Sequence, residues 1–134
     1  MTREIKFKAK IVMDIEFLAM KKGDWVEGYY YEDLQDGEWC SWIKERNDIT
    51  HYKVDKNTLG QFTGMLDKNG KEIWENDIVD LAGVKMFVEF IDGGFYAREN
   101  HEGAGLHDLF FENDEMNVIS NIFDNPELLK TETL

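Results

Sequence analysis

Residues 61–80, QFTGMLDKNGKEIWENDIVD, constrain the fold of this chain more than any other segment. Asn69 and Gly70 lie between two strand-like runs, residues 59–66 and 71–74. Because Asn and Gly both tolerate positive φ angles, the pair predicts a tight type I′ turn. The segment therefore predicts a β-hairpin, and with it a fold built from antiparallel strands that are close in sequence.

The strand pattern continues beyond this hairpin. Asn76 and Asp77 predict a second turn, which leads into a short strand at residues 78–81. Asp92, which is followed by two glycines, predicts another hairpin. A run of short antiparallel strands of this kind predicts a small SH3-like barrel or a curled antiparallel sheet over residues 57–134.

The first part of the chain also has the pattern of β-structure. Its opening residues alternate apolar and lysine side chains, as in a half-buried strand. Residues 25–32 are rich in aromatic side chains, and Asp36 with the glycine after it predicts a two-residue hairpin into residues 39–43. We therefore expect an N-terminal strand region, residues 1–56, that packs on the barrel-like region.

The last third of the chain is less regular. Residues 109–111 and 117–122 are predicted as strands that complete the sheet. Asn125 and Pro126 form a helix-start signature, because Asn caps a helix and Pro fits its first turn. A short C-terminal helix through Lys130 is expected. The whole chain is predicted to be a single domain of mainly β structure, in the β-rich α+β class.

Bulk composition limits the setting of the protein. At 134 residues, the chain can bury one hydrophobic core without metal or disulfide crosslinks. Cys40 is the only cysteine, which indicates a reducing compartment. The sequence contains no apolar run of the length that a membrane span requires. We expect a soluble protein in the cytoplasm of a bacterial host cell.

Four ordered segments carry a resemblance to a known family: REIKFKA, WVEGYYYED, VDKNTLGQFTGMLDKNGKEIWENDIV and VISNIFDNPELL. Together they span nearly the whole chain and resemble the YopX family of phage and prophage proteins. The resemblance implies a β-rich fold and a home in temperate-phage genomes, and it implies no catalytic residue. Asn76 stands where the family usually has Gly, and Asn is the residue other than Gly best able to adopt a left-handed φ. Asn69, Gly70, Asn76 and Asp77 are therefore interpreted as structural turn residues.

Charge is distributed unevenly along the chain, which has a formal net charge of −13. Residues 1–22 hold six Lys or Arg against three acids, residues 23–98 hold eight against sixteen, and residues 99–134 hold one against nine. This acidity repels phosphate backbones and argues against a nucleic-acid partner. An alternative interpretation is an acidic DNA mimic that inhibits a DNA-binding host protein.

A stretch after residue 99 combines two histidines with four carboxylates. These residues are His101, Glu102, His107, Asp108, Glu112 and Asp114. Because such nitrogen and oxygen donors bind divalent metals, a metal-dependent hydrolase or nuclease is one alternative function. Their spacing lacks helical regularity, so surface histidines in an acidic loop, with no metal, are the favoured interpretation.

Other candidate chemistry has less support in the sequence. Cys40 and His51 are a nucleophile and a base by type, but no third residue at an informative spacing would orient them. Carboxylates in turns, such as Asp33 and Asp36, more often accept backbone N–H groups than catalyse proton transfer. The sequence has no phosphate-binding loop, and we expect no cofactor and no small-molecule ligand.

Aromatic residues suggest a different kind of function. Trp25, Tyr29 and Tyr31 share one face of a predicted strand, and Trp39 and Trp42 lie in the return strand. They form either part of the core or a surface for association, since Trp and Tyr are enriched at interfaces. We predict a non-enzymatic phage accessory protein that acts through protein contacts, as a homo-oligomer or with a host or phage protein.

Overall fold

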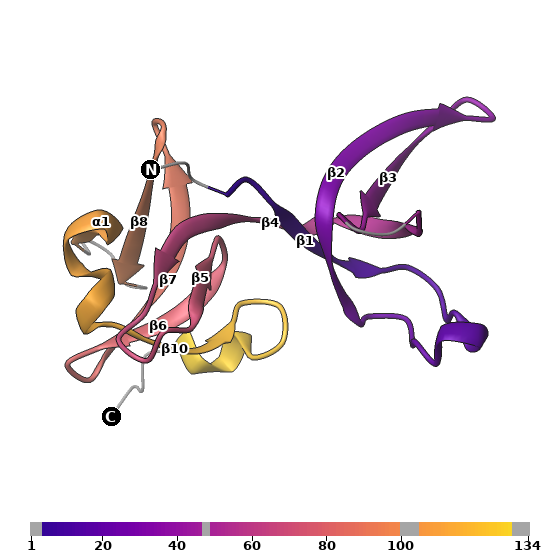
Figure 1. Cartoon of the computed structure of the whole chain (residues 1–134). Coiled ribbons are helices and arrows are strands. Elements are labelled where there is room, and N and C mark those ends of the chain that lie inside the picture. Colours follow the sequence, from indigo (N-terminus) through magenta and orange to yellow (C-terminus); the bar gives the residue numbers. More distant parts are fainter. Residues whose placement is uncertain (1–3, 47–48, 100–104, 130–134) are drawn as a thin grey trace. The chain divides into compact units, whose positions relative to one another are not determined.

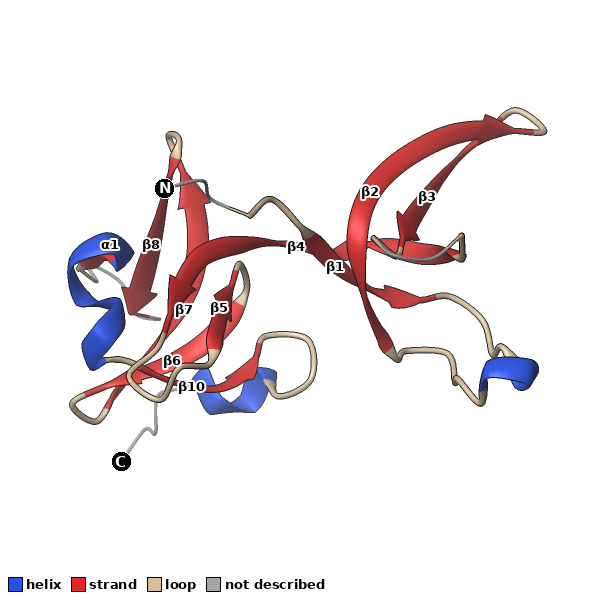
Figure 2. Ribbon diagram, in the orientation of Figure 1, coloured by secondary structure: helices blue, strands red, loops and turns tan. Residues whose placement is uncertain are grey.

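The computed structural model describes residues 4–46, 49–99 and 105–129. Strands dominate it and helices are few and short (Figure 2), which confirms the prediction of a mainly β fold. The chain divides into two compact units, Met1–Gln61 and Phe62–Leu134. No helix within the described residues is long and apolar enough to cross a lipid bilayer.

The N-terminal unit is a closed ring of four antiparallel strands. Its elements are β1 (Phe7–Ile11), η1 (Glu16–Leu18), β2 (Trp25–Gln35), β3 (Glu38–Lys44) and the first part of β4 (His51–Leu66). Each strand pairs with the next, and β4 also pairs with β1, which closes the ring. In Figure 1, the β2–β3 hairpin extends beyond the other strands of this unit. The sequence had indicated a barrel only after residue 57, so the position of the closed ring is a finding of the structure.

The ring encloses its own small core, which consists of Ala9, Ile11, Val26, Ile43, Tyr52 and Val54. Gly28 lies where β2 changes its partner from β1 to β3. A Cβ atom at this position would come within 2.0 Å of the Lys44 carbonyl oxygen. Glycine therefore permits the close backbone approach that a small ring requires at this corner.

The C-terminal unit contains an open antiparallel sheet with the strand order β10-β6-β7-β8-β9. Its elements are β5 (Glu72–Trp74), β6 (Asp77–Leu81), β7 (Val84–Ile91), β8 (Gly94–Glu99), β9 (Leu106–Asp108), α1 (Leu109–Glu112), η2 (Asn113–Glu115), β10 (Asn117–Asn121) and η3 (Pro126–Leu129). The end of β4 pairs with β5 in this unit. A second core lies here, formed by Ile73, Val79, Met86, Val88, Phe95, Ala97, Leu109, Met116 and Val118.

Two other predicted hairpins form with the positive φ angles of a type I′ turn. Asp36 and Gly37 have φ angles of 50° and 82°, and Asp92 and Gly93 have 47° and 84°. The hairpin at Asn69 and Gly70 also forms, because β4 pairs with β5, but its predicted turn type is wrong. Gly70 alone has a positive φ, at 80°, and its N–H donates to the Asp67 carbonyl oxygen at 3.0 Å. The turn is therefore a type I turn followed by a left-handed glycine.

The predicted strand at residues 109–111 is also wrong, because these residues form helix α1. The Asp108 side chain caps the helix by accepting the Phe110 N–H at 3.0 Å. Leu109 is buried in the core, whereas the Phe110 and Phe111 side chains are 69% and 74% exposed. The strand expected near residue 117 is β10, and the helix expected after Asn125 is the 3-10 turn η3.

Candidate functional site: an aromatic and cationic face of the N-terminal unit

Strand β2 directs alternate side chains to opposite faces, and this alternation places its aromatic residues. Val26 and Tyr30 point toward the core of the ring. Trp25, Tyr29 and Tyr31 therefore lie on the outer face, and the Tyr29 side chain is 47% exposed. The outer face of the ring is thus partly built from large aromatic rings.

Tyr31 is the centre of a three-ring cluster on this outer face. It is the cross-strand partner of Trp42, and the two rings stack with centroids 6.3 Å apart and planes 11° from parallel. The His51 ring meets the Tyr31 ring edge-on, with ring centroids 5.6 Å apart, and the Tyr31 hydroxyl lies 2.6 Å from His51 Nδ1. Trp42 Nε1 donates to Asp33 Oδ1 at 2.7 Å. Burial, and then the Asp33 carboxylate, raise the pKa of Tyr31, so its hydroxyl stays protonated at neutral pH.

Cations lie over the other aromatic rings of this face. The Lys8 and Lys10 ammonium groups lie 5.0 Å and 5.3 Å from the centroid of the Trp25 ring. The Arg46 guanidinium lies 5.6 Å from the Tyr29 ring and also forms an ion pair with Glu4. Cation–π contacts of this kind hold both partners in place before any ligand binds.

We call this surface the Trp25–Trp42 face. It comprises Lys8, Lys10, Trp25, Tyr29, Tyr31, Trp42, Arg46, His51 and Lys53, the last of which is exposed and is the cross-strand partner of Trp42. The structure thus brings together four of the five aromatic residues singled out in the sequence.

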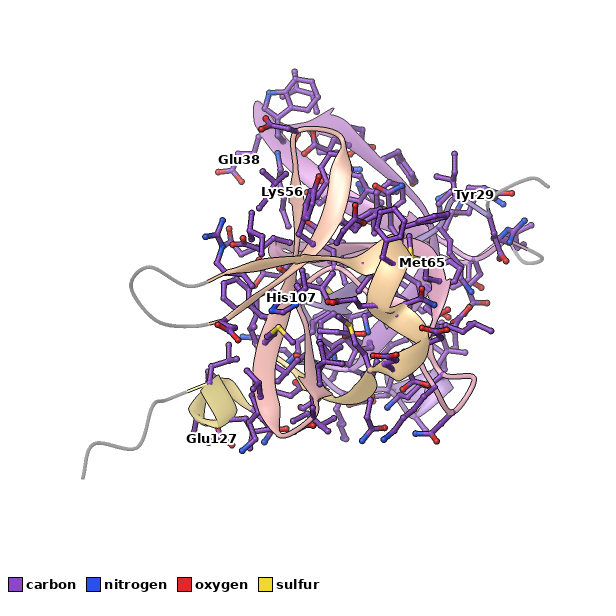
Figure 3. All side chains as sticks on the ribbon, turned by 90° about the vertical axis from the view of Figure 1, so that its left-hand side faces the viewer. Tyr29, Glu38, Lys56, Met65, His107 and Glu127 are labelled. Atoms are coloured by element: carbon purple, nitrogen blue, oxygen red, sulfur yellow. The ribbon has the colours of Figure 1, made fainter. Side chains whose placement is uncertain are left out.

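Trp39, the fifth, lies on the opposite face of the hairpin. It is three residues from Trp42 along one strand, so their side chains point to opposite sides. Trp39 is 72% exposed and pairs across the hairpin with Leu34. In Figure 3, Glu38 and Lys56 lie on one side of the N-terminal unit and Tyr29 on the other.

The face of Trp39 carries a shallow depression with a volume of about 430 Å³, lined by Glu32, Trp39, Ser41 and Lys56. Lys56 Nζ lies 2.8 Å from Glu32 Oε1, and the Tyr30 hydroxyl donates to the same carboxylate at 2.8 Å. The hydrogen bond from Lys56, followed by that from Tyr30, lowers the pKa of Glu32. These charges are already paired with one another.

The predicted metal residues are only partly within the described structure. His101 and Glu102 lie outside the described residues. His107 Nδ1 is 2.7 Å from Glu112 Oε2, and His107 Nε2 is 3.8 Å from Glu99 Oε1. Asp108 caps α1. Within residues 4–46, 49–99 and 105–129, no three His, Cys, Asp or Glu side chains are arranged to hold a metal ion.

Cys40 and His51, the candidate nucleophile and base, have separate partners. Cys40 is buried, and its Sγ lies 3.9 Å from the Glu38 carbonyl oxygen. The Nδ1 atom of His51 contacts the Tyr31 hydroxyl. Each of these side chains therefore serves the packing of the hairpin.

Each of the four predicted turn residues has a backbone role. Gly70 ends the type I turn, and Asn69 donates its N–H to Asp67 Oδ1 at 2.8 Å. Asn76 has a φ of 74°, as expected for a residue in place of Gly, and its N–H donates to the Val88 carbonyl oxygen at 2.8 Å. Asp77 is buried and accepts the Trp74 N–H at 2.8 Å.

Asp67 is an important residue that the sequence analysis missed. Its buried carboxylate accepts N–H groups from Asn69, Lys71 and Val118 at 2.8 Å, 2.9 Å and 2.9 Å. Burial acts to raise the pKa of Asp67, but these three donors and Lys71 lower it more, to below its ordinary value of 3.8. An Asp at the first position of a turn is the signal that could have identified it.

Comparison with known proteins agrees with the resemblance in the sequence. The model of the family described as YopX protein matches residues 17–130. The chain belongs to the YopX family. The crystal structure of protein EF1440 from Enterococcus faecalis is similar at 21% identity and a TM-score of 0.47, over 96% of this chain and 100% of that one. No curated protein is significantly similar to the chain in sequence.

Proposed function

We propose that this YopX protein is a non-enzymatic binding module whose Trp25–Trp42 face contacts an acidic protein surface. The observation that carries the proposal is the set of cations placed directly over exposed or partly exposed aromatic rings. Trp, Tyr and Arg are the residues that most often dominate the binding energy of interfaces. In this face all three types occur together.

The local charge of the face supports an acidic partner. Lys8, Lys10, Arg46 and Lys53 lie on this surface, and Lys6 lies 3.8 Å from Glu27 beside them. The carboxylates among these cations already have local partners: Glu4 pairs with Arg46, Asp33 accepts from Trp42, and Glu27 and Asp55 are the cross-strand partners of Lys8 and Lys10. Exposed cations of this kind favour encounter with carboxylate-rich surfaces. Because the rings and cations already contact one another, binding would immobilise few additional side chains. The setting we propose is the cytoplasm of a bacterial cell that carries the phage genome.

Capture from a bacterial lysate with two matched tryptophan variants tests this function. We expect Trp42→Ala to lose an identified partner that both the wild type and Trp39→Ala retain, because Trp39 lies on the opposite face. The partner is then purified and its binding is measured directly. Circular dichroism confirms the fold of each variant, and Tyr29→Ala provides a second change within the face. Equal capture by the two tryptophan variants and by Tyr29→Ala would refute the proposal.

A further inference from the structure

A second exposed aromatic surface lies on α1 and η2 in the C-terminal unit. Phe110 and Phe111 are 69% and 74% exposed, and their rings meet edge-to-face with centroids 5.2 Å apart. Their position is fixed locally, because Leu109 is buried in the core and Asp108 caps the helix. Two adjacent exposed phenylalanines are unusual on a surface that contacts only water.

Carboxylates flank these two phenylalanines in the sequence. We call the phenylalanines and their neighbours the Phe110–Phe111 patch, which comprises Asp108, Phe110, Phe111, Glu112, Asp114 and Glu115. Asp114 and Glu115 are exposed in η2. The sequence contains no Lys or Arg from residue 99 to residue 129. Lys68 is adjacent in space, since its N–H donates to the Met116 carbonyl oxygen at 2.9 Å, and His107 contacts Glu112 at 2.7 Å. The patch thus combines exposed apolar rings with a local excess of carboxylates.

The two surfaces are complementary in both respects. The Trp25–Trp42 face presents aromatic rings with cations over them, and the Phe110–Phe111 patch presents aromatic rings among carboxylates. The complementarity is local to the two surfaces, because both units are net negative: residues 1–61 hold ten Lys or Arg against twelve acids and residues 62–134 hold five against sixteen. Specific interfaces often combine aromatic pairs with charged side chains of opposite sign on the two partners.

We infer that the partner of the Trp25–Trp42 face is the Phe110–Phe111 patch of a second copy of this chain. This inference rests on the proposed function, since it specifies the occupant of the same face. The two surfaces are different, so the contact is heterologous, and one such contact leaves a pair of copies with one unused face and one unused patch. Such contacts either close, the smallest closed form being a dimer with two reciprocal contacts, or continue as an open head-to-tail series.

Sedimentation of the full chain at increasing protein concentration tests the inference. We expect species larger than a monomer at about 0.01 M salt, where the Debye length is about 30 Å, and dissociation toward monomer at about 1 M, where it is about 3 Å. Lys8→Glu with Lys53→Glu is expected to weaken association about tenfold or more, because it replaces attraction with repulsion. Lys21→Glu with Lys22→Glu is the matched control, since it makes the same charge change at exposed residues outside the face.

A charge exchange separates this contact from general electrostatics. Asp114→Lys with Glu115→Lys is also expected to weaken association about tenfold. Mixing this variant with the Lys8→Glu, Lys53→Glu variant is expected to restore association, because the reversed face of one variant then meets the reversed patch of the other, which has the opposite sign. A chain that combines all four substitutions is expected to associate with itself. Thermal unfolding verifies that each variant is folded.

The outcomes also separate this inference from the proposed function. A monomer at every concentration and salt level would overturn self-association, and so would failure of the mixture to associate. An oligothymidylate tests single-stranded nucleic acid as the alternative occupant of the face. If it binds the wild type, if Lys8→Glu with Lys53→Glu abolishes this binding, and if the chain does not self-associate, the inference is overturned. The proposed function is judged independently by the capture experiment with Trp42→Ala, in which a partner other than this chain still supports the face as a binding surface.

Discussion

The two units of this YopX protein use charged side chains in opposite ways. In the N-terminal ring, Lys8, Lys10 and Arg46 lie over aromatic rings at the surface. In the C-terminal unit, Asp67 and Asp77 are buried and hold backbone N–H groups of turns. The difference teaches that some of the carboxylates in the second half stabilise the fold. Only the remaining, exposed carboxylates of that half are available to bind a partner.

The largest expected effect concerns the corner of the ring. Gly28→Ala places a Cβ within 2.0 Å of the Lys44 carbonyl oxygen, so the β2–β3 pairing must shift. We expect a loss of unfolding free energy of about 3 kcal/mol or more, measured by urea denaturation. Gly105→Ala is the control, because a Cβ there meets no atom within 4 Å. Equal stability of the two variants would show that the ring tolerates a side chain at its corner.

The next effect concerns the buried carboxylate of the other unit. Asp67→Asn replaces one accepting oxygen by an NH₂ group that faces an N–H donor. We expect a loss of about 2 to 3 kcal/mol at pH 7, since hydrogen bonds to a charged group are lost and a donor is left buried. Denaturant titration measures this loss. A change in unfolding free energy below about 0.5 kcal/mol would show that the Asp67 carboxylate does not stabilise the fold.

The same carboxylate predicts a pH dependence. Because the folded state lowers the pKa of Asp67 below 3.8, its stabilising contribution is complete above that value and is lost as the pH falls through the folded pKa. The unfolding free energy of the wild type should therefore fall more steeply below about pH 4 than that of Asp67→Asn. Denaturation at stepwise lower pH measures the two slopes, and parallel curves would contradict the prediction.

A smaller, stabilising effect is expected at a turn of the C-terminal unit. Ala82 has a φ of 52°, a left-handed conformation that is strained for alanine. Ala82→Asn should raise the unfolding free energy by about 0.5 to 1 kcal/mol, because Asn adopts this conformation more readily. Thermal unfolding measures the change. Asp92→Ala, at a turn residue with a φ of 47°, provides the reverse test and should lower stability by a similar amount.

The smallest effect is expected on the face opposite the proposed binding surface. Trp39 is 72% exposed, so Trp39→Ala should change the unfolding free energy by about 0.5 kcal/mol or less. Chemical denaturation of Trp39→Ala beside the wild type checks this value. A large loss of stability would mean that Trp39 packs as a core residue and is unsuitable as the control for Trp42→Ala.

Local sequence patterns predicted the strands better than their closure. The Asp36 and Asp92 turns lie between adjacent strands, so two residues sufficed to predict each hairpin. Closure of the ring depends on β1 and β4, in which Phe7 pairs with Gln61. Pairing between strands so far apart in sequence leaves no short-range signal. The sequence therefore predicts a barrel only for residues 57–134, whereas the closed ring lies in the N-terminal unit.

The errors have equally local causes. Residues 109–111 are apolar enough to predict a strand, but the cap by Asp108 starts a helix and leaves two phenylalanines exposed. Asn69 and Gly70 suggested a type I′ turn, whereas the carboxylate of Asp67 holds the turn in another geometry. The candidate face was predicted in part, since alternation along β2 grouped Trp25, Tyr29 and Tyr31, but the cations over these rings come from other segments.

Strand β4, His51–Leu66, continues without interruption through the point at which the two units divide. Its first part pairs with β1 and β3, and its end pairs with β5. Domain boundaries usually fall in exposed linkers, where an exchange of gene segments does little damage. A crossover near residue 61 would instead join two β4 halves of different origin within one strand that pairs with β1, β3 and β5. The two halves of this protein are therefore expected to be inherited together, as one indivisible module.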